Sequence, residues 1–321
     1  MKKAFNFDFM KHRNHFFMIS GAIFLIGIIF NFINPPQLDI KFTGGAILKY
    51  SYSGAAAIDP NKVDDEIEKA TGKVVTTSAT ESATTTGDAD RRIVISFNEK
   101  KAVDKTVTDK VDEGLKAAYP DLSFKLEETN SVDPTMGGEF LLKCIVAVLL
   151  AVLFMVLYVA IRFRKIGGIS AGVSGILAIV HDIIVVYFVF VIFGYPLDDN
   201  FIAAVLAIIG FSLNDTIVIF DRIRENRRLL GPKATVGDIA NASINQTLGR
   251  TIYTSVCVFL SVLVMAIIAV VYGVDSVVTF AIPMMFGVVS GSYSTICISI
   301  GIWAIWNEKY PQHATKKRKS K

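Results

Sequence analysis

Two carboxylates lie inside long apolar stretches of this 321-residue chain. Asp182 is the one acid within residues 166 to 197, and Asp215 is the one acid within residues 200 to 220. An ionisable side chain in the hydrocarbon of a bilayer costs at least about 2.5 kcal/mol, which makes each of them a functional hypothesis. At a rise of about 1.5 Å per residue, Asp182 lies roughly 18 Å and Asp215 roughly 22 Å from the outer end of its stretch. Two antiparallel helices would hold them at similar depth, as in a proton relay.

A purely structural interpretation of both acids stays open. Each could be a polar staple that hydrogen-bonds to Ser, Thr or Asn on a neighbouring helix, with Asn214 and Thr216 beside Asp215. His181 precedes Asp182, but successive helical side chains point about 100° apart, so we expect no shared ligand face and no metal site. His181 is then either a hydrogen-bonding residue between helices or a proton carrier, since imidazole titrates near physiological pH.

Basic residues follow on the side of the membrane where the second acid-bearing stretch ends. Asp221 and Arg222, with Arg224 and Glu225 close by, are typical of a solvated helix end. Arg250 differs, because it follows the mostly uncharged residues 242 to 249 and directly precedes another apolar stretch. Its long side chain can reach along the helix toward Asp215, which allows an acid–arginine switch. A plain anchor at the membrane interface is the alternative.

These residues need membrane-spanning helices to position them. The chain is 52% hydrophobic and only 19% charged, which argues against an ordinary soluble protein. Long apolar stretches, several without any charge, are each long enough to cross a bilayer. We predict a polytopic α-helical membrane protein with six spans, at residues 16–34, 140–161, 168–193, 200–220, 251–272 and 277–305. Gly168 with Gly172, and Gly287 with Gly291, have the spacing of close helix contacts.

The distribution of Lys and Arg predicts the orientation of the spans. Four precede the first span, three lie at 162–165, six lie from Arg222 to Arg250 and six from Lys309 onward, whereas residues 194–199 and 272–276 have none. We therefore expect the N-terminus, residues 1–15, and the basic tail, residues 307–321, to be cytoplasmic. Residues 35–138 are expected outside, and the tail is expected to contact anionic membrane lipids.

Residues 35–138 have the pattern of one soluble α+β domain. Alternating apolar residues predict strands at 38–42 and 47–50 around Gly44 and Gly45, and further strands at 73–77, 93–97 and 122–127. Helical patterns begin at Pro60 and Val103, and residues 78–90 are predicted to be a loop. The predicted order is ββαββαβ, an antiparallel sheet with helices on one face.

Motifs for nucleotide binding are missing from the sequence. It contains no P-loop and no dinucleotide-binding glycine pattern, and residues 35–138 carry no nucleophile or acid–base motif. We therefore expect no enzyme activity, no cofactor and no nucleic-acid partner. An ion gradient or a partner protein is the remaining source of energy.

Several motifs together resemble the SecF family of bacterial protein-export subunits, within the resistance-nodulation-division superfamily. They are Phe7-Asp8-Phe9, Phe42-Thr43-Gly44-Gly45, His181-Asp182, IIGFSLNDTIVIFDRIRE at 208–225, SINQTLGRTIYTS at 243–255 and GSYSTI at 291–296. The resemblance runs over nearly the whole chain. The 208–225 and 243–255 runs are its most specific part.

The resemblance implies an extracytoplasmic ferredoxin-like domain between the first two of six spans. It implies a complex with SecD and the SecYEG channel in the bacterial cytoplasmic membrane, contact with the translocating unfolded polypeptide, and translocation driven by the proton-motive force. Asp215 and Arg250 fill the motif positions of the family's proton path. One departure is Lys41, which stands where the family usually has Asp, so a role for an acid there is not carried over.

Two other functions remain open at this stage. One is a proton-coupled exporter of small molecules or lipids from the same superfamily. Such an exporter would be expected to combine twelve spans and two large external domains, or to form its own substrate cavity, and this chain has half that number of spans and domains. The other is a passive scaffold whose buried acids only hold the helices together. In that case neutralising Asp215 would damage assembly rather than proton dependence.

Overall fold

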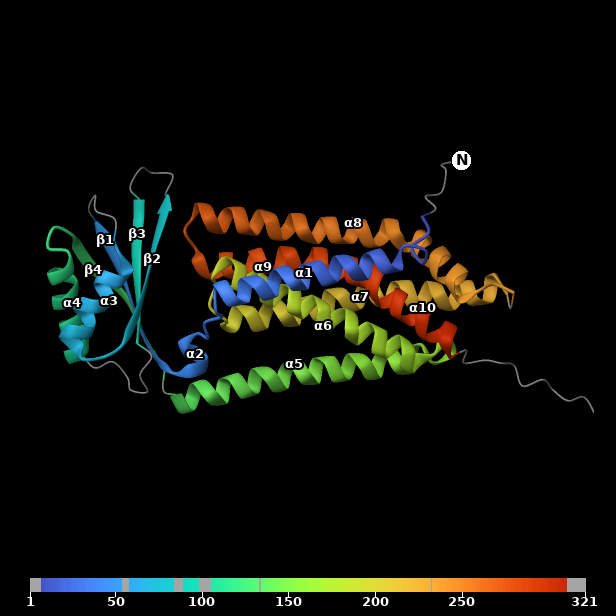
Figure 1. Ribbon diagram of the computed structural model, residues 1–321, viewed down its shortest axis with the longest axis horizontal. Helices are drawn as coiled ribbons and strands as arrows, with labels where there is room; N and C mark the ends of the chain where they lie inside the picture. Colours follow the sequence, from blue (N-terminus) through green and yellow to red (C-terminus); the bar gives the residue numbers. More distant parts are fainter. Residues whose placement is uncertain are drawn as a thin grey trace, which may run out of the picture.

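A computed structural model describes residues 7–53, 58–83, 89–97, 105–132, 134–231 and 233–310. Long helices form a bundle, and a sheet covered by two helices lies at one end of it (Figure 1). In the described part of the chain, six helical segments are long and apolar enough to span a membrane. The prediction of a polytopic helical membrane protein is confirmed.

The helices of the bundle follow one another with short connections. They are α1 (Arg13–Ile33), α5 (Pro134–Arg162), α6 (Gly168–Phe193), α7 (Asp199–Leu229), α8 (Val236–Val271), and a last span made of α9 (Asp275–Tyr293), the π-helix η2 (Ser294–Ser299) and α10 (Ile300–Lys309). A short 3-10 helix, η1 (Arg164–Ile166), joins α5 to α6. Asp198 caps α7, and Thr235 and Asp238 form a reciprocal capping box at the start of α8.

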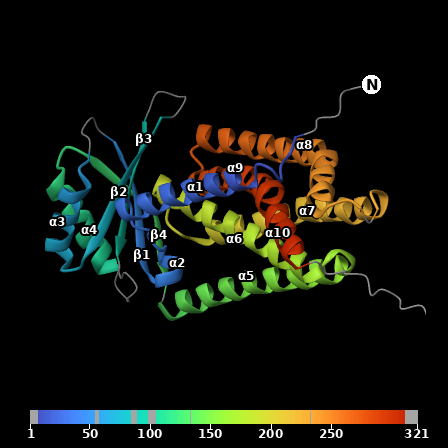
Figure 2. The same cartoon turned by 45° about the vertical axis from the view of Figure 1, so that its right-hand side comes forward.

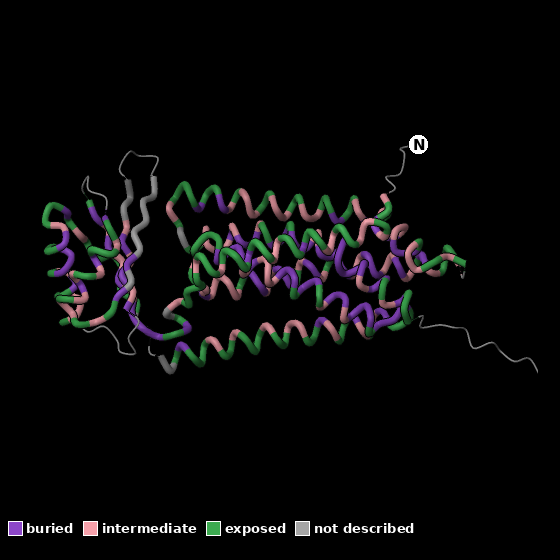
Figure 3. The backbone as a smooth tube through the Cα atoms, viewed as in Figure 1, coloured by how far each residue is buried: buried purple, intermediate pink, exposed green. Residues whose placement is uncertain are grey.

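Three of the six spans form the interior of the bundle. In their most apolar windows, α6, α7 and the last span have 56%, 44% and 72% of residues buried, against 6% for α1 and 11% for both α5 and α8. Figure 3 shows the buried segments concentrated along these inner helices. Polar side chains of α6, α7 and the last span can therefore meet away from lipid, whereas α1, α5 and α8 expose apolar side chains to the surroundings.

Two of the long helices are irregular. The last span contains Pro283 in α9 and then the π-helical turn η2, after which α10 leaves the line of α9 (Figures 1 and 2). Proline and π-turns are the usual causes of such bends. Helix α8 begins well before the predicted span at 251, and Figure 2 shows its first part at a steep angle to the rest.

The sheet domain has the order βαββαβ. Its elements are β1 (Gly45–Ser53), α3 (Pro60–Thr71), β2 (Val75–Ala83), β3 (Ala89–Phe97), α4 (Lys105–Ala118) and β4 (Ser123–Val132). The strands lie in the order β2-β3-β1-β4, and every neighbouring pair is antiparallel. One face of the sheet packs on α3 and α4, and its core includes Leu48, Ile93 and Ile95 from the strands and Ile67 and Leu115 from the helices.

The prediction of a strand at residues 38–42 is wrong. This segment contains the short helix α2 (Ile40–Thr43), because the Asp39 side chain accepts a hydrogen bond from the Lys41 backbone and the Asp39 carbonyl accepts from Phe42 and Thr43. Such local capping by Asp competes successfully with a strand. An alternation of apolar and polar residues over only five positions does not distinguish a strand from a short helix.

The predicted loop at 78–90 is also wrong over most of its length. Strand β2 continues to Ala83 and β3 starts at Ala89, in a continuous antiparallel register. The stretch is rich in Thr, Ser and Ala and lacks the apolar alternation that predicts a strand. Strand β2 forms without it, because β2 lies at the edge of the sheet. Residues 84–88 lie outside the described residues. Strand β4 likewise extends beyond the predicted end at 127.

Gly168→Ala is expected to destabilise the bundle by about 2 kcal/mol, because overpacking against an immovable group costs roughly 1 to 3 kcal/mol. A β-carbon at Gly168 would lie 2.2 Å from the Ala160 backbone carbonyl oxygen of α5. Gly287→Ala should cost less, since its closest contact is the flexible tip of Ile208. Gly210→Ala is the control, with nothing within 4 Å of the added carbon. Thermal unfolding in detergent measures all three, and equal effects at Gly168 and Gly210 would contradict the packing argument.

Candidate functional site

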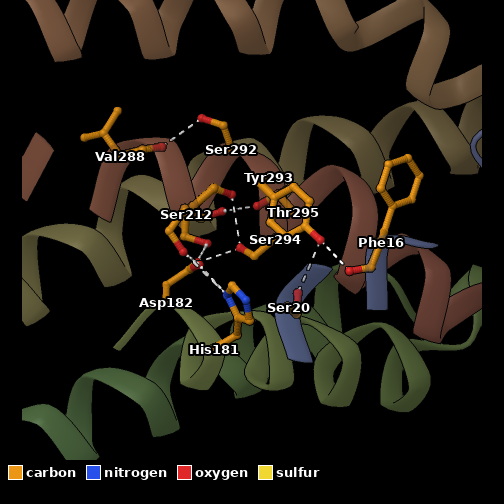
Figure 4. Close-up of polar contacts among 12 residues, drawn as sticks. Phe16, Ser20, His181, Asp182, Ser212, Val288, Ser292, Tyr293, Ser294 and Thr295 are labelled. Atoms are coloured by element: carbon orange, nitrogen blue, oxygen red, sulfur yellow. Dashed lines mark hydrogen bonds and ion pairs between the residues drawn. The ribbon is translucent and has the colours of Figure 1, made fainter. Parts of the chain in front are cut away.

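Asp182 is fully buried in α6 and is surrounded by hydroxyl groups from three other helical segments. Its Oδ1 accepts a hydrogen bond from Ser290 of α9 at 2.7 Å. Its Oδ2 accepts from Ser212 of α7 at 3.0 Å and from Ser294 of η2 at 2.7 Å. Figure 4 shows Ser212 and Ser294 beside the Asp182 carboxylate. Asp182 thus links the three inner helices of the bundle.

His181 is adjacent to this cluster rather than turned away from it. Its Nδ1 lies 3.2 Å from Asp182 Oδ1, so the expectation that the two side chains diverge is wrong. The reason is that two flexible side chains can close a 100° separation of their β-carbons through their χ angles. The ring stacks on Phe24 of α1 with centroids 5.2 Å apart. Its Nε2 is buried and has no hydrogen-bond partner among the described residues.

A tyrosine connects the same region to α1. The Tyr293 hydroxyl donates to the Phe16 carbonyl oxygen at 2.5 Å and lies 3.3 Å from the Ser20 hydroxyl. Tyr293 ends α9, and the π-helix η2 begins at the next residue. Because π-turns are frequent at functional sites, the position of η2 beside Asp182 supports this polar region as a candidate site.

Asp215 has a different environment. It lies on α7 and is 2% exposed, yet its Oδ2 has no hydrogen-bond partner among the described residues. The expected support from its neighbours is missing: Asn214 is exposed, and the Thr216 hydroxyl donates to the Ser212 carbonyl at 2.8 Å instead. No hydrogen bond joins Asp215 to Asp182 within the described residues. Both acids are buried, but Asp182 accepts hydrogen bonds at both carboxylate oxygens, whereas Asp215 has a buried oxygen without a partner among the described residues.

Arg250 lies on α8 with its residue exposed. It is near enough to Asp215 for their opposite charges to attract, but the described residues contain no ion pair within 4.0 Å between them. Asp221, one to two turns beyond Asp215, pairs with Arg162 of α5 and with Arg224, both at 2.9 Å. Arg222 pairs with Glu225 and donates to Gln246 of α8 at 2.6 Å. Asp221 and Arg222 therefore connect helices, which is more than a solvated helix end would do.

A cavity of about 730 Å³ opens where α7 and the first part of α8 meet. It starts at Val218, one turn from Asp215, and continues to Leu229 near the end of α7. Its lining contains Asp221, Arg222, Arg224, Glu225, Arg228, Gln246, Thr247 and Arg250. Water that fills this cavity would come within a helical turn of Asp215.

The predicted glycine motifs lie at tight positions. Gly44 and Gly45 have φ values of 75° and 136°, in the region that favours glycine, and form the turn between α2 and β1. Gly287 packs against Ile208, and Gly291 lies next to Phe211 and Ser212 of α7. Gly287 also lies close to Val186 of α6, so α9 packs on both α6 and α7, and Ser290 of α9 reaches Asp182 of α6.

Sequence reasoning missed the serines around Asp182. Ser212 and Ser294 lie within the motif runs at 208–225 and 291–296, so a signal was present. It could not be read as a site, because serine in a membrane helix commonly bonds to its own backbone. Ser174 and Ser255, for example, donate to carbonyl oxygens of their own helices.

Comparisons with known proteins decide the family. The family model described as "Protein export membrane protein SecD/SecF, C-terminal" matches residues 110–309, which include Asp182, Asp215 and Arg250. The chain is 33% identical over 304 residues to the protein translocase subunit SecF of Calditerrivibrio nitroreducens, with 94% of each protein covered. The chain belongs to the SecD/SecF family. With its six apolar helices, it is a multi-pass membrane protein of a bacterial family.

Other members of the SecD/SecF family extend the comparison. The SecF subunit of Alicyclobacillus acidocaldarius is 30% identical over 310 residues, covering 97% of this chain and 96% of the relative. The crystal structure of SecDF from Thermus thermophilus, described as a translocon-associated membrane protein, matches with a TM-score of 0.78 and 25% identity over 96% of this chain. The chain spans 40% of that longer SecDF chain.

Proposed function

We propose that this protein is a non-enzymatic subunit of the Sec protein-export machinery that acts with SecD and the SecYEG channel and uses the proton-motive force. The family membership and the names of the relatives, protein translocase subunits SecF and SecDF, support the assignment to export. The observation that carries the proton role is Asp215, a buried carboxylate with one oxygen free of hydrogen bonds. Such a group can accept and release a proton without breaking a packed network.

In this proposal Asp215 is the proton carrier and Arg250 responds to its charge. When Asp215 is ionised, attraction draws the flexible Arg250 side chain toward it, and protonation releases the arginine. The cavity next to Val218 supplies a water route toward the cytoplasm. Because α7 and α8 carry the two groups, the change in charge becomes a change in how these helices pack.

Asp182 and His181 have a supporting role in the same proposal. The carboxylate of Asp182 accepts from three serines and contacts His181, so moving it would leave several buried polar groups without partners. We infer that Asp182 holds α6, α7 and the last span together as a fixed centre, against which α8 moves. His181 completes this anchor and joins it to α1 through its contact with Phe24.

The sheet domain is proposed to be a ferredoxin-like domain on the extracytoplasmic side, with both chain termini in the cytoplasm. Its βαββαβ order and the strand order β2-β3-β1-β4 support the first statement. The segment before it contacts the α6–α7 connection, where Leu197 donates to the Gln37 carbonyl and accepts from Asp39. A displacement of the α6–α7 connection would thus reach the domain, which we propose contacts the emerging unfolded polypeptide.

Lys41 strengthens this connection. Its ammonium contacts Asp199 of α7 at 2.6 Å. Burial alone would lower the pKa of Lys41, but the hydrogen bond and charge of Asp199 outweigh it and raise the pKa. Both partners are about half exposed, so the pair itself is worth under about 1 kcal/mol. The basic residue that replaces the usual acid of the family therefore has a local partner of its own.

Reconstitution tests the proposal. Proteoliposomes with SecYEG and SecD, with or without this protein, would translocate a secretory precursor under an imposed proton gradient. We expect the protein to raise the yield only when the gradient is present, and an ionophore to remove the gain. An equal gain without a gradient would favour a passive scaffold, and failure to co-purify with SecD would contradict the assignment to the complex.

A further inference from the structure

The cavity between α7 and the first part of α8 has an excess of positive charge. Its lining holds four arginines, at 222, 224, 228 and 250, against two carboxylates, Asp221 and Glu225. Both acids are already paired: Asp221 with Arg162 and Arg224, and Glu225 with Arg222. Arg228 and Arg250 have no ion pair or hydrogen bond through their side chains in the described part of the chain. Two guanidinium groups therefore line the cavity without a hydrogen-bonded partner among the described residues, and of the two only Arg250 is near Asp215.

Further hydrogen-bond donors line the same space. Gln246 accepts from Arg222 at 2.6 Å and from Asn226 at 2.8 Å through its side-chain oxygen. Both contacts fix the amide so that its NH₂ group, which has no acceptor among the described residues, is left to donate. An anion with several oxygens matches arginines and an amide donor better than a single carboxylate does, since guanidinium binds phosphate through paired hydrogen bonds.

The position of the cavity selects the kind of anion. Helix α7 has 31 residues and α8 has 36, so at about 1.5 Å per residue both exceed the roughly 30 Å of hydrocarbon in a bilayer. Their joined ends project beyond the other helices in Figure 1, and the cavity lies there. Val218 and Leu229 add apolar surface at its two ends. A phosphate with an attached apolar chain fits a polar cavity at the level of the lipid headgroups.

We propose that this cavity is a binding site for a phosphate group, supplied by the headgroup of an anionic phospholipid. Free inorganic phosphate offers the same chemistry without the apolar part. Arg228 and Arg250 would bind the phosphate oxygens, with Gln246 as a further donor. Arg250 also has a role in the proposed proton transport, whereas Arg228 has none, so the test below rests on Arg228.

The test compares two neighbouring arginines in the full-length protein. Arg228→Gln removes a charge from the cavity. Arg227→Gln removes the same charge from the same helix, but Arg227 donates to the Lys165 carbonyl and does not line the cavity. Purified variants would be titrated with short-chain phosphatidylglycerol, short-chain phosphatidylcholine and inorganic phosphate, and bound molecules counted by native mass spectrometry. Circular dichroism would verify that both variants keep their helices.

We expect one phosphatidylglycerol to bind, with an affinity about five- to tenfold lower in Arg228→Gln, because one charge-assisted hydrogen bond is lost. Arg227→Gln should stay within about twofold of the wild type, since diffuse surface attraction changes little with one charge. Binding of inorganic phosphate with the same dependence on Arg228 would support the site and identify free phosphate as its ligand. Equal losses in both variants, equal binding of phosphatidylcholine, or no binding would overturn the proposal.

Discussion

Asp215→Asn is expected to abolish the response of protein export to a proton gradient while the protein stays inserted and in its complex. Asparagine has nearly the shape of aspartate but cannot take up a proton. One oxygen of Asp215 has no hydrogen-bond partner in the described structure, so the substitution breaks no packed network. The expected loss is therefore the whole gradient-dependent gain, with little change in stability.

The measurement is translocation of a precursor into vesicles with and without an imposed gradient, alongside co-purification with SecD. Asp215→Glu keeps a titratable group and should retain part of the gain. Asn214→Ala changes the exposed neighbour on the same helix and should behave like the wild type. If Asp215→Asn instead disrupted the complex, the carboxylate would have a structural role between helices. Asp215 would then not be the proton carrier.

Much of the membrane architecture was predictable because the bilayer imposes a simple rule on sequence. The stretch that contains Asp182 is flanked by Arg, Lys and glycine at one end and by glycine and proline at the other, and α6 is found there. The start of helix α8 was harder to predict, because its first part is amphipathic rather than wholly apolar and lies at an angle to the rest (Figure 2). Length and hydropathy do not report such a bend.

The difference between the two acids could not be predicted from sequence. Asp215 has Thr216 beside it in the chain, yet it is Asp182 that is surrounded by hydroxyl groups, and its partners come from residues 30 to 112 positions away. Which serine faces which helix depends on helix rotation and on the π-helical turn at Ser294, and neither follows from hydropathy. The sequence motifs contain these residues, but only the packed structure shows that both oxygens of Asp182 accept hydrogen bonds and that one oxygen of Asp215 has no partner among the described residues.

In the proposed function, this contrast would let one bundle both hold its shape and change with protonation. An acid with a full set of donors resists movement, because every departure leaves buried groups unpaired. An acid with an open oxygen can change its charge at lower cost. Ser212, which bonds to Asp182, lies three residues before Asp215 on α7, so the open carboxylate lies directly beside the fixed centre.

Asp182→Ala is accordingly expected to destabilise the protein by about 2 to 4 kcal/mol. Removing the carboxylate leaves the hydroxyls of Ser212, Ser290 and Ser294 without their acceptor and opens a small cavity. Each buried unsatisfied donor costs about 1 to 3 kcal/mol, less where a serine turns back to its own backbone, as Ser294 can toward Gly291. Unfolding in detergent, by heat or denaturant, measures the loss.

The decisive comparison removes donors and acceptor together. Changing the three serines to alanine in the Asp182→Ala background should destabilise by less than the sum of the separate changes, because no buried donor is left unpaired. Strict additivity, or a loss under about 0.5 kcal/mol for Asp182→Ala, would mean that the hydrogen bonds do not hold the helices.

Asp182→Asn, which keeps an acceptor oxygen, should weaken the bundle less and retain the response to a proton gradient. Loss of that response with the fold intact would make Asp182 a proton carrier as well, and the anchor would have to lie elsewhere.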